Sequence, residues 1–309
     1  MILLLTLGLA SAILPDNTFE EVIDIAAAHG LSCVEVMCWP KGKALRRYAG
    51  VTHIDADTVT EEQAKHYVDY AASKGVIISA LGYYPNTMDA DPAKREVYIR
   101  HIYKLIDLSH RMGVNRVTTF IGRNLSVDFE SNLEEMVVVW TPILRYAQEK
   151  GVQICIENCP MYYTRDEWPG GTNLACSPYV WRTMFERMPF DNFGLNYDPS
   201  HMLLQGADYI RPIYEFKDRI FHAHIKDIKM YPDKIYEYGM FGYPSKFHSP
   251  KVPGLGDIDW GAFMSALYDI RYEGPVCIEI EDKAFESCPE DVLKSIAVSV
   301  KHISQFYQK

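Results

Sequence analysis

The sequence has no excess of basic residues. Its 309 residues contain 31 Lys and Arg against 41 Asp and Glu, a formal net charge of −10 at pH 7. Proteins that bind nucleic acid in general depend on clustered Lys and Arg, which neutralise backbone phosphates. The acidic balance therefore argues against a general nucleic-acid binder, and we expect no nucleic-acid partner.

The chain also lacks any CxxC pair. Its 7 cysteines are an odd number, and several lie inside apolar runs such as CVEVMC (33–38) and QICIENC (153–159). A disulfide framework in a secreted protein normally uses an even number of cysteines at regular spacings. We interpret these residues as reduced, mostly buried thiols and expect a cytoplasmic protein.

No run of residues is long and apolar enough to predict a membrane span. The opening MILLLTLGLASAILP imitates a secretory leader, because a short apolar run precedes an A-x-A-like ASA. However, no Lys or Arg precedes that run, as a leader would require. We interpret residues 2–9 as a buried first strand that the mature protein retains.

Short apolar runs alternate with amphipathic segments along the whole chain, as buried parallel strands alternate with crossover helices. The predicted strands are residues 2–9, 32–38, 76–82, 114–122, 152–158, 192–198, 219–227 and 275–282. The predicted helices are residues 16–30, 60–75, 95–113, 130–151, 177–188, 208–218, 259–274 and 289–308. Eight regular units predict a single (β/α)8 TIM barrel over residues 1–309 rather than a doubly wound open sheet.

Three connections are long, at residues 39–60, 159–176 and 228–257. Each follows a predicted strand, so each belongs to the C-terminal face, where barrel active sites are built. The last one is rich in Tyr, Phe, Pro and Gly, which favours an ordered lid over a disordered linker. A packed surface loop or an oligomer contact is the alternative, and we expect a homo-oligomer.

Acids and histidines gather at the ends of the last four predicted strands. In a barrel these strand ends are neighbours around one mouth. The residues are Glu157 on strand five, Asp198 on strand six, His222, His224, Lys226 and Asp227 on strand seven, and Glu279, Glu281 and Asp282 on strand eight. The sequence therefore predicts a cluster of carboxylates and imidazole at the C-terminal face.

Buried carboxylates that lie so close repel each other unless a cation neutralises them. Carboxylate oxygens with one imidazole form a hard ligand set, which suits Mn²⁺, and also Mg²⁺ or Co²⁺, better than a thiolate-rich zinc site. Side chains two residues apart on a strand point the same way. The pattern therefore does not decide between His222 and His224, or between Glu279 and Glu281.

Five motifs resemble the sugar phosphate isomerase/epimerase group of xylose-isomerase-like barrels, which includes ketose 3-epimerases and inosose dehydratase. They are IENCP (156–160), DPSH (198–201), HIKD (224–227), PGLGDIDW (253–260) and GPVCIE (274–279). The resemblance covers nearly the whole chain, because the motifs fall at the expected strand ends. It is specific for the superfamily and weak for the substrate.

The resemblance implies that a divalent metal, Mn²⁺ first, is held by Glu157, Asp198, His224 and Glu279. It also implies that Glu157 and Glu279 act as the acid–base pair, and that His201 contacts a substrate oxygen. The further substrate-binding candidates are Lys226, Asp227, His222 and Tyr163. His222, Glu281 and Asp282 could instead orient the ligands.

Two departures argue against a simple ketose 3-epimerase. Met230 stands where those enzymes have an Arg, and Tyr163 stands where they have a Glu. A sugar isomerase or epimerase remains the first hypothesis, and a keto-sugar or keto-inositol lyase, including cleavage of 3-keto glycosides, is the second. The absence of a Gly-rich loop after strand seven favours a sugar that is not phosphorylated. A DNA-repair endonuclease and a non-catalytic binding barrel are the remaining hypotheses.

Overall fold

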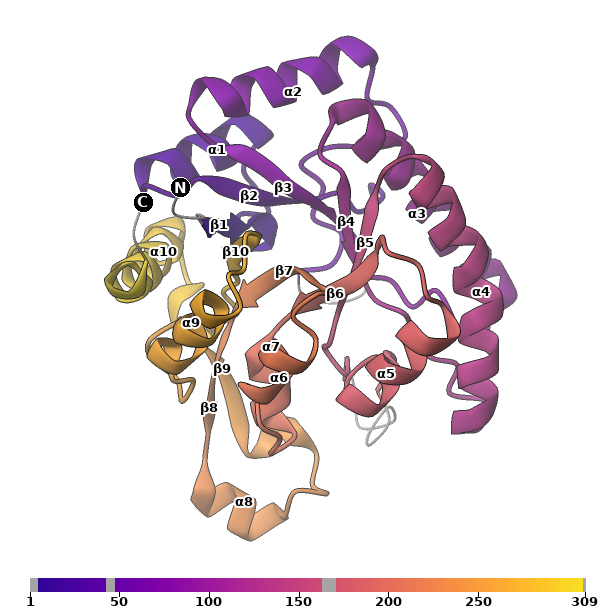
Figure 1. Ribbon diagram of the computed structural model, residues 1–309. Coiled ribbons are helices and arrows are strands. Elements are labelled where there is room, and N and C mark those ends of the chain that lie inside the picture. The colour runs from indigo at the N-terminus through magenta and orange to yellow at the C-terminus, as the bar shows by residue number, and fades with distance from the viewer. Residues whose placement is uncertain (1–4, 43–47, 163–170, 308–309) are drawn as a thin grey trace.

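A computed structural model describes residues 5–42, 48–162 and 171–307. Within these residues, parallel strands close into a barrel in the order β1-β10-β7-β6-β5-β4-β3-β2 (Figure 1). They are β1 (Thr6–Ala10), β2 (Cys33–Met37), β3 (Ile77–Gly82), β4 (Arg116–Thr119), β5 (Gln153–Glu157), β6 (Phe193–Tyr197), β7 (Ile220–Ile225) and β10 (Pro275–Ile278). The predicted (β/α)8 TIM barrel is confirmed, and each barrel strand overlaps one predicted strand.

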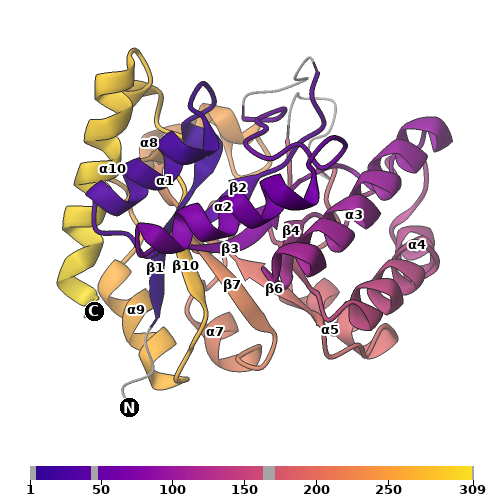
Figure 2. The ribbon, with the colours of Figure 1, turned by 90° about the horizontal axis from the view of Figure 1, so that it is seen from above.

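Helices cover the outside of the barrel (Figures 1 and 2). The long ones are α1 (Phe19–Ala28), α2 (Glu61–Ser73), α3 (Pro92–Met112), α4 (Phe129–Glu149), α5 (Pro178–Arg187), α9 (Trp260–Asp269) and α10 (Pro289–Ile303). Local sequence sets their starts. Thr18 and Thr60 form capping boxes with Glu21 and Gln63, and Asp91 caps α3 just before a proline in its first turn.

The connection between β6 and β7 differs from the prediction of one helix over residues 208–218. The structure has two short helices there, α6 (Pro199–Leu204) and α7 (Arg211–Glu215). Pro199 occupies the first turn of α6, and Asp198 caps it by accepting a hydrogen bond from the Ser200 amide at 2.7 Å. Because proline fits a first helical turn and an Asp cap favours it, the DPSH motif starts a helix directly after β6.

The long connection after β7 is ordered, as predicted, but it is built around a hairpin that was not predicted. β8 (Asp227–Met230) pairs antiparallel with β9 (His248–Lys251), and α8 (Pro232–Tyr238) lies between them. Figure 1 shows this arm projecting away from the barrel. At its far end Tyr236 and Phe241 are 95% and 92% exposed, so these two aromatic side chains do not cover the barrel mouth.

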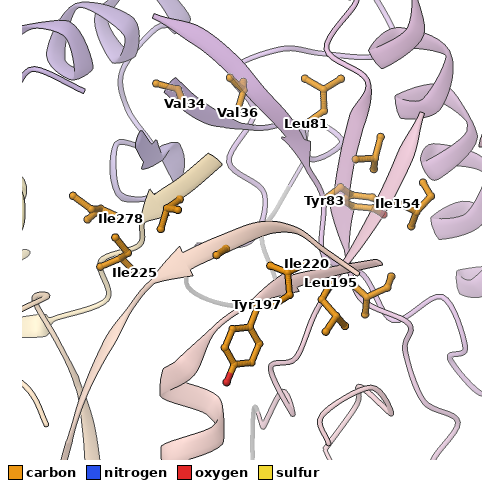
Figure 3. Packing of buried hydrophobic residues seen from close by; sticks show 14 of the residues in the cluster. Val34, Val36, Leu81, Tyr83, Ile154, Leu195, Tyr197, Ile220, Ile225 and Ile278 are labelled. Atoms are coloured by element: carbon orange, nitrogen blue, oxygen red, sulfur yellow. The ribbon is translucent and has the colours of Figure 1, made fainter. Parts of the chain in front are cut away.

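Apolar side chains of the barrel strands pack outward against the helices. Val34, Leu81, Ile154, Leu195 and Ile278 belong to this layer (Figure 3). The alternate side chains, which point into the barrel, include buried polar groups: Glu35, Thr118, Asn196, His222 and His224. Barrel interiors are usually filled by branched aliphatic residues. In this barrel, buried polar side chains occupy much of the interior below the C-terminal mouth.

Among the residues that the structure describes, no helix combines the length and the apolar character needed to cross a membrane.

Candidate metal centre and active-site cavity

A cavity of about 880 Å³ opens at the C-terminal ends of the barrel strands. Glu157, His201, His224, Lys226 and Glu279 contribute to its polar side. A separate apolar cluster at the mouth supplies the other side, through Ala10, Met37, Tyr84, Phe120 and Met161. The β8–β9 arm lines part of the cavity with Tyr243, His248 and Lys251. The cavity therefore has one charged side and one apolar side.

Four side chains from adjacent strands converge beside this cavity, and three of them, Glu157, His224 and Glu279, line it. Glu157 ends β5, Asp198 follows β6, His224 lies on β7 and Glu279 follows β10. One ligand atom from each lies within 4.8 Å of the others. The structure thus brings together the four predicted metal ligands, which we call the quartet, and leaves Glu281 and His222 outside it.

The orientation of the quartet fits a divalent cation. Asp198 Oδ2, His224 Nδ1 and Glu279 Oε2 are buried and form no hydrogen bond with the described residues. His224 Nδ1 and Glu279 Oε2 are 2.9 Å apart without hydrogen-bond geometry. Leaving such an atom unpaired costs roughly 1–3 kcal/mol. A cation bound by three carboxylates and one imidazole would satisfy all three atoms, and this donor set is hard and oxygen-rich.

Asp198 and His224 also make contacts through the atoms that face away from the other quartet ligands. Asp198 Oδ1 accepts from the Ser200 amide at 2.7 Å, and His224 Nε2 lies 2.6 Å from Glu35 Oε2. Asn158 clamps the Asp198 backbone twice, donating to its carbonyl and accepting from its amide, both at 2.8 Å. Because Asn158 directly follows Glu157, the IENCP motif fixes the β5 and β6 ligands relative to each other.

Charge around the quartet shifts its carboxyl groups in opposite directions. Burial raises the pKa of Glu279 above its ordinary value, and nearby Lys226 and His224 offset only part of that effect. Burial also acts on Glu157, but His201 and His224 outweigh it and hold the pKa of Glu157 well below its ordinary value. Among the protein groups alone, Glu157 is therefore held ionised more firmly than Glu279.

His201 lies on α6 and faces the cavity beside the quartet. Its Nε2 atom is 3.3 Å from Glu157 Oε1 and 3.1 Å from Asp198 Oδ2. Burial disfavours its charged form, but the charge of Asp198 outweighs burial and raises the pKa of His201 well above its ordinary value. The position suits the predicted contact with a substrate oxygen, and that contact stays a prediction.

Lys226 is a buried cation in the cavity wall, only 6% exposed. Its Nζ atom lies 3.0 Å from Glu279 Oε1 and 2.9 Å from Glu281 Oε2. Glu281 is therefore paired with Lys226. Glu279 contacts Lys226 through one carboxylate oxygen, and its other oxygen faces the remaining quartet ligands. Lys226 is placed to reach a ligand in the cavity, as predicted for a substrate-binding residue.

Asp227 occupies a different environment. Its carboxylate accepts five hydrogen bonds, from the amides of Ile228, Gly254, Gly256 and Ile258 and from Trp260 Nε1. These bonds use the acceptor capacity of the carboxylate. They also account for the PGLGDIDW motif, because a Cβ at Gly256 would lie 2.1 Å from Asp227 Oδ1. The geometry favours Asp227 as the anchor of this loop over the predicted substrate contact.

His222 and Tyr163 complete the predicted substrate-binding residues. His222 is fully buried below the cavity, with Nδ1 2.8 Å from Asn196 Oδ1 and Nε2 3.2 Å from Ser79 Oγ. Both ring nitrogens are therefore engaged inside the barrel, which favours a structural role. Tyr163 lies outside the described residues. Asp282 accepts from Lys251 and from the Val252 amide, and so holds β9 against the rim.

Glu35 is the site residue that sequence reasoning missed. It lies in the middle of β2, is fully buried, and accepts from Tyr84 and Thr118 as well as contacting His224. Burial favours its neutral form, but the charge of His224 outweighs burial and lowers the pKa of Glu35 to about 2. The available signal was an acid inside the apolar run CVEVMC, which a buried strand tolerates only with a partner.

Comparisons with known proteins agree with this architecture. A family model described as xylose isomerase-like TIM barrel matches residues 23–302. The inosose dehydratase of Clostridium tetani is 32% identical over 97 residues, which is 31% of this chain and 33% of that protein. The chain thus matches about a third of that relative's length.

Two solved structures share the fold at low sequence identity. The structure of IOLI protein with a binding zinc atom has a TM-score of 0.73 and 18% identity, and the match covers 99% of this chain and 100% of that one. D-psicose 3-epimerase from Clostridium cellulolyticum H10, solved with D-tagatose, has a TM-score of 0.71 and 15% identity, with coverage of 99% and 100%.

Proposed function

The chain belongs to the xylose isomerase-like TIM-barrel family, and from that premise we propose that it is a divalent-metal-dependent sugar isomerase or epimerase. It removes a proton from the carbon next to a carbonyl group of a sugar or sugar derivative. The observation that carries the proposal is the quartet, in which three buried atoms from adjacent strands converge without a hydrogen-bond partner among the described residues. Mn²⁺ is the first choice of cation, and Mg²⁺ or Co²⁺ would suit the same oxygen-rich set.

A divalent cation bound there would polarise the substrate carbonyl and so acidify the neighbouring C–H bond. The surrounding side chains would have different roles. Glu157 and Glu279 come from the outer two of four adjacent strands, so they can flank a substrate and exchange its proton. Asp198 and His224 come from the strands between them and mainly hold the cation. His201 contacts a substrate oxygen.

The same first step leads to different products, depending on where the proton and electrons go next. Return of the proton to the opposite face of the same carbon gives an epimer, and return to the neighbouring carbon gives an isomer. If an oxygen leaving group sits β to the carbonyl, its C–O bond breaks, a C=C bond forms, and the leaving group takes up a proton. The sequence match to an inosose dehydratase supports this lyase activity as the second candidate.

The cavity supports a sugar as the substrate class. Its charged side can bind hydroxyl and carbonyl oxygens, while Phe120, Tyr84 and Met37 offer an apolar surface for carbon-bound hydrogens. We propose a sugar or sugar derivative without a phosphate group. A homo-oligomer, a cytoplasmic location and a single catalytic domain over residues 1–309 stay predictions.

The test is a panel of keto-sugars, keto-inositols and 3-keto glycosides incubated with the Mn²⁺-loaded protein in D₂O. Mass spectrometry separates the outcomes. Deuterium gain at constant carbon skeleton indicates epimerisation or isomerisation, and loss of water or of the aglycone indicates elimination. If no compound in any of the three classes exchanges or reacts above the metal-free control, the proposed function is wrong.

His201→Ala is expected to lower turnover about 10²- to 10⁴-fold, the range typical of a positioned catalytic group. The cation should stay bound, because His201 is outside the quartet. Steady-state kinetics and Mn²⁺ titration measure the two effects separately. Met202→Leu, a volume-conserving change in the same helix, serves as the control and should alter neither. Loss of Mn²⁺ binding in His201→Ala would instead make His201 part of the metal site.

A further inference from the structure

A carboxylate lies behind the imidazole of the quartet, on the side away from the other three ligands. Glu35 Oε2 is 2.6 Å from His224 Nε2, and both side chains are buried, at 0% and 1% exposure. A carboxylate oxygen only accepts hydrogen bonds. The hydrogen on Nε2 therefore points to Glu35, and Nδ1 is the ring nitrogen that would give up its proton to bind a cation.

Nδ1 is the ring atom that faces the quartet. It lies 2.9 Å from Glu279 Oε2 and 3.6 Å from Glu157 Oε1. We infer that Glu35 is a positioning residue, which fixes the tautomer and orientation of His224 so that Nδ1 is presented to the divalent cation. The inference rests on the proposed metal site. It goes further by assigning a part in building that site to β2, a strand that contributes none of the four ligands.

Glu35 is itself held from the other side. Its Oε1 atom accepts from the Tyr84 hydroxyl and from Thr118 Oγ1. A Cβ at Gly82 would lie 3.0 Å from Glu35 Oε1 and 2.8 Å from Met37 Cε, so the glycine at the end of β3 leaves room for the carboxylate. Asn196 Nδ2 lies 3.0 Å from His224 Nε2 and 3.1 Å from the Tyr84 oxygen, which can accept its hydrogen. These contacts therefore hold the Glu35 carboxylate in place independently of its contact with His224.

A second cation among Glu35, His222 and His224 is the alternative explanation, since their ligand atoms also lie within 4.8 Å of one another. The geometry argues against it. Ligand atoms that share one cation at bond lengths of about 2.1 Å normally lie roughly 3 Å or more apart, whereas Glu35 Oε2 and His224 Nε2 are at a hydrogen-bond distance of 2.6 Å. In addition, both nitrogens of His222 already contact Asn196 and Ser79.

The test uses the full chain with Glu35→Met, which removes the acceptor while keeping side-chain length. Mn²⁺ affinity, measured by calorimetric titration, should fall about 10- to 100-fold, as for other groups that orient a metal-bound histidine. The visible absorption spectrum of the Co²⁺-loaded protein should change as well, because the imidazole reorients. Glu35→Gln, which keeps a neutral acceptor, should lose less affinity than Glu35→Met.

Ser79→Ala is the matched control, because it removes a buried hydrogen bond to His222, the neighbouring imidazole of β7, at 3.2 Å. It should leave Mn²⁺ affinity and the Co²⁺ spectrum unchanged. Mn²⁺ affinity and a Co²⁺ spectrum equal to wild type in Glu35→Met would overturn the inference. If Glu35→Met does not fold, wild-type affinity and spectrum in Glu35→Gln would overturn it. If the wild-type chain binds two cations and Glu35→Met binds one, the second-cation explanation would replace the inference. A wild-type chain that binds no cation would instead remove the proposed function.

Discussion

Glu157→Gln and Glu279→Gln are each expected to lower proton exchange at the substrate carbon by at least about 10²- to 10⁴-fold, the contribution of a positioned acid or base. Glutamine keeps the size of the side chain and an oxygen ligand, but it cannot take up the proton. The measurement is the rate of deuterium incorporation from D₂O at saturating Mn²⁺, so that a weakened metal site does not imitate lost proton transfer.

Glu281→Gln is the matched control for this experiment. Glu281 also ends near the cavity and pairs with Lys226 at 2.9 Å, but it is not part of the quartet. Its replacement should therefore slow exchange far less than the replacement of Glu279. Exchange at the wild-type rate in Glu279→Gln would show that the acid–base pair is assigned wrongly, and Lys226 would become the next candidate.

Removal of divalent cations by a chelator is expected to abolish turnover, and added Mn²⁺ should restore it. The same cation should stabilise the fold, because it satisfies buried atoms of Asp198, His224 and Glu279 that otherwise have no hydrogen-bond partner among the described residues. At a free concentration about 100 times Kd, binding adds roughly 2.7 kcal/mol to the free energy of unfolding. For a chain of 309 residues, that raises Tm by on the order of 4 °C. Thermal unfolding with and without Mn²⁺ measures it.

Asp198→Ala separates this effect from general ion effects on the protein. It removes one ligand from the quartet, and should lose both the Tm increase and the recovery of turnover at the same Mn²⁺ concentration. A change of equal size in Asp198→Ala and the wild-type chain would show that Mn²⁺ acts elsewhere on the protein.

The barrel and the cluster of carboxylates and imidazoles at its mouth could be predicted because both follow from local sequence, and the family resemblance then selected the quartet. Each ligand stands at or near the end of an apolar run, and adjacent parallel strands end around one mouth. The choice within each pair could not be derived from the pattern, since His222 and His224 point the same way, as do Glu279 and Glu281. Depth separates them in the structure: His222 contacts Ser79 below the cavity, and Glu281 pairs with Lys226.

Other features depend on contacts that no local pattern records. Glu35 and His224 are 189 positions apart, so only the closed barrel brings them together. The strands β8 and β9 are short and include residues such as Lys229 and Pro250, which do not give a strand pattern. The helix expected over residues 208–218 is reduced to α7 because Pro212 fits only a first helical turn, while Asp208 before it accepts hydrogen bonds from the Ile210 and Arg211 amides.

A crystal structure of the protein soaked in Mn²⁺, with anomalous diffraction to locate the metal, tests the central claim most directly. The account predicts one strong peak beside the cavity, bonded to Glu157, Asp198, His224 and Glu279 at about 2.0–2.6 Å. A metal peak elsewhere, with these four side chains more than about 4 Å from any shared metal position, would contradict it.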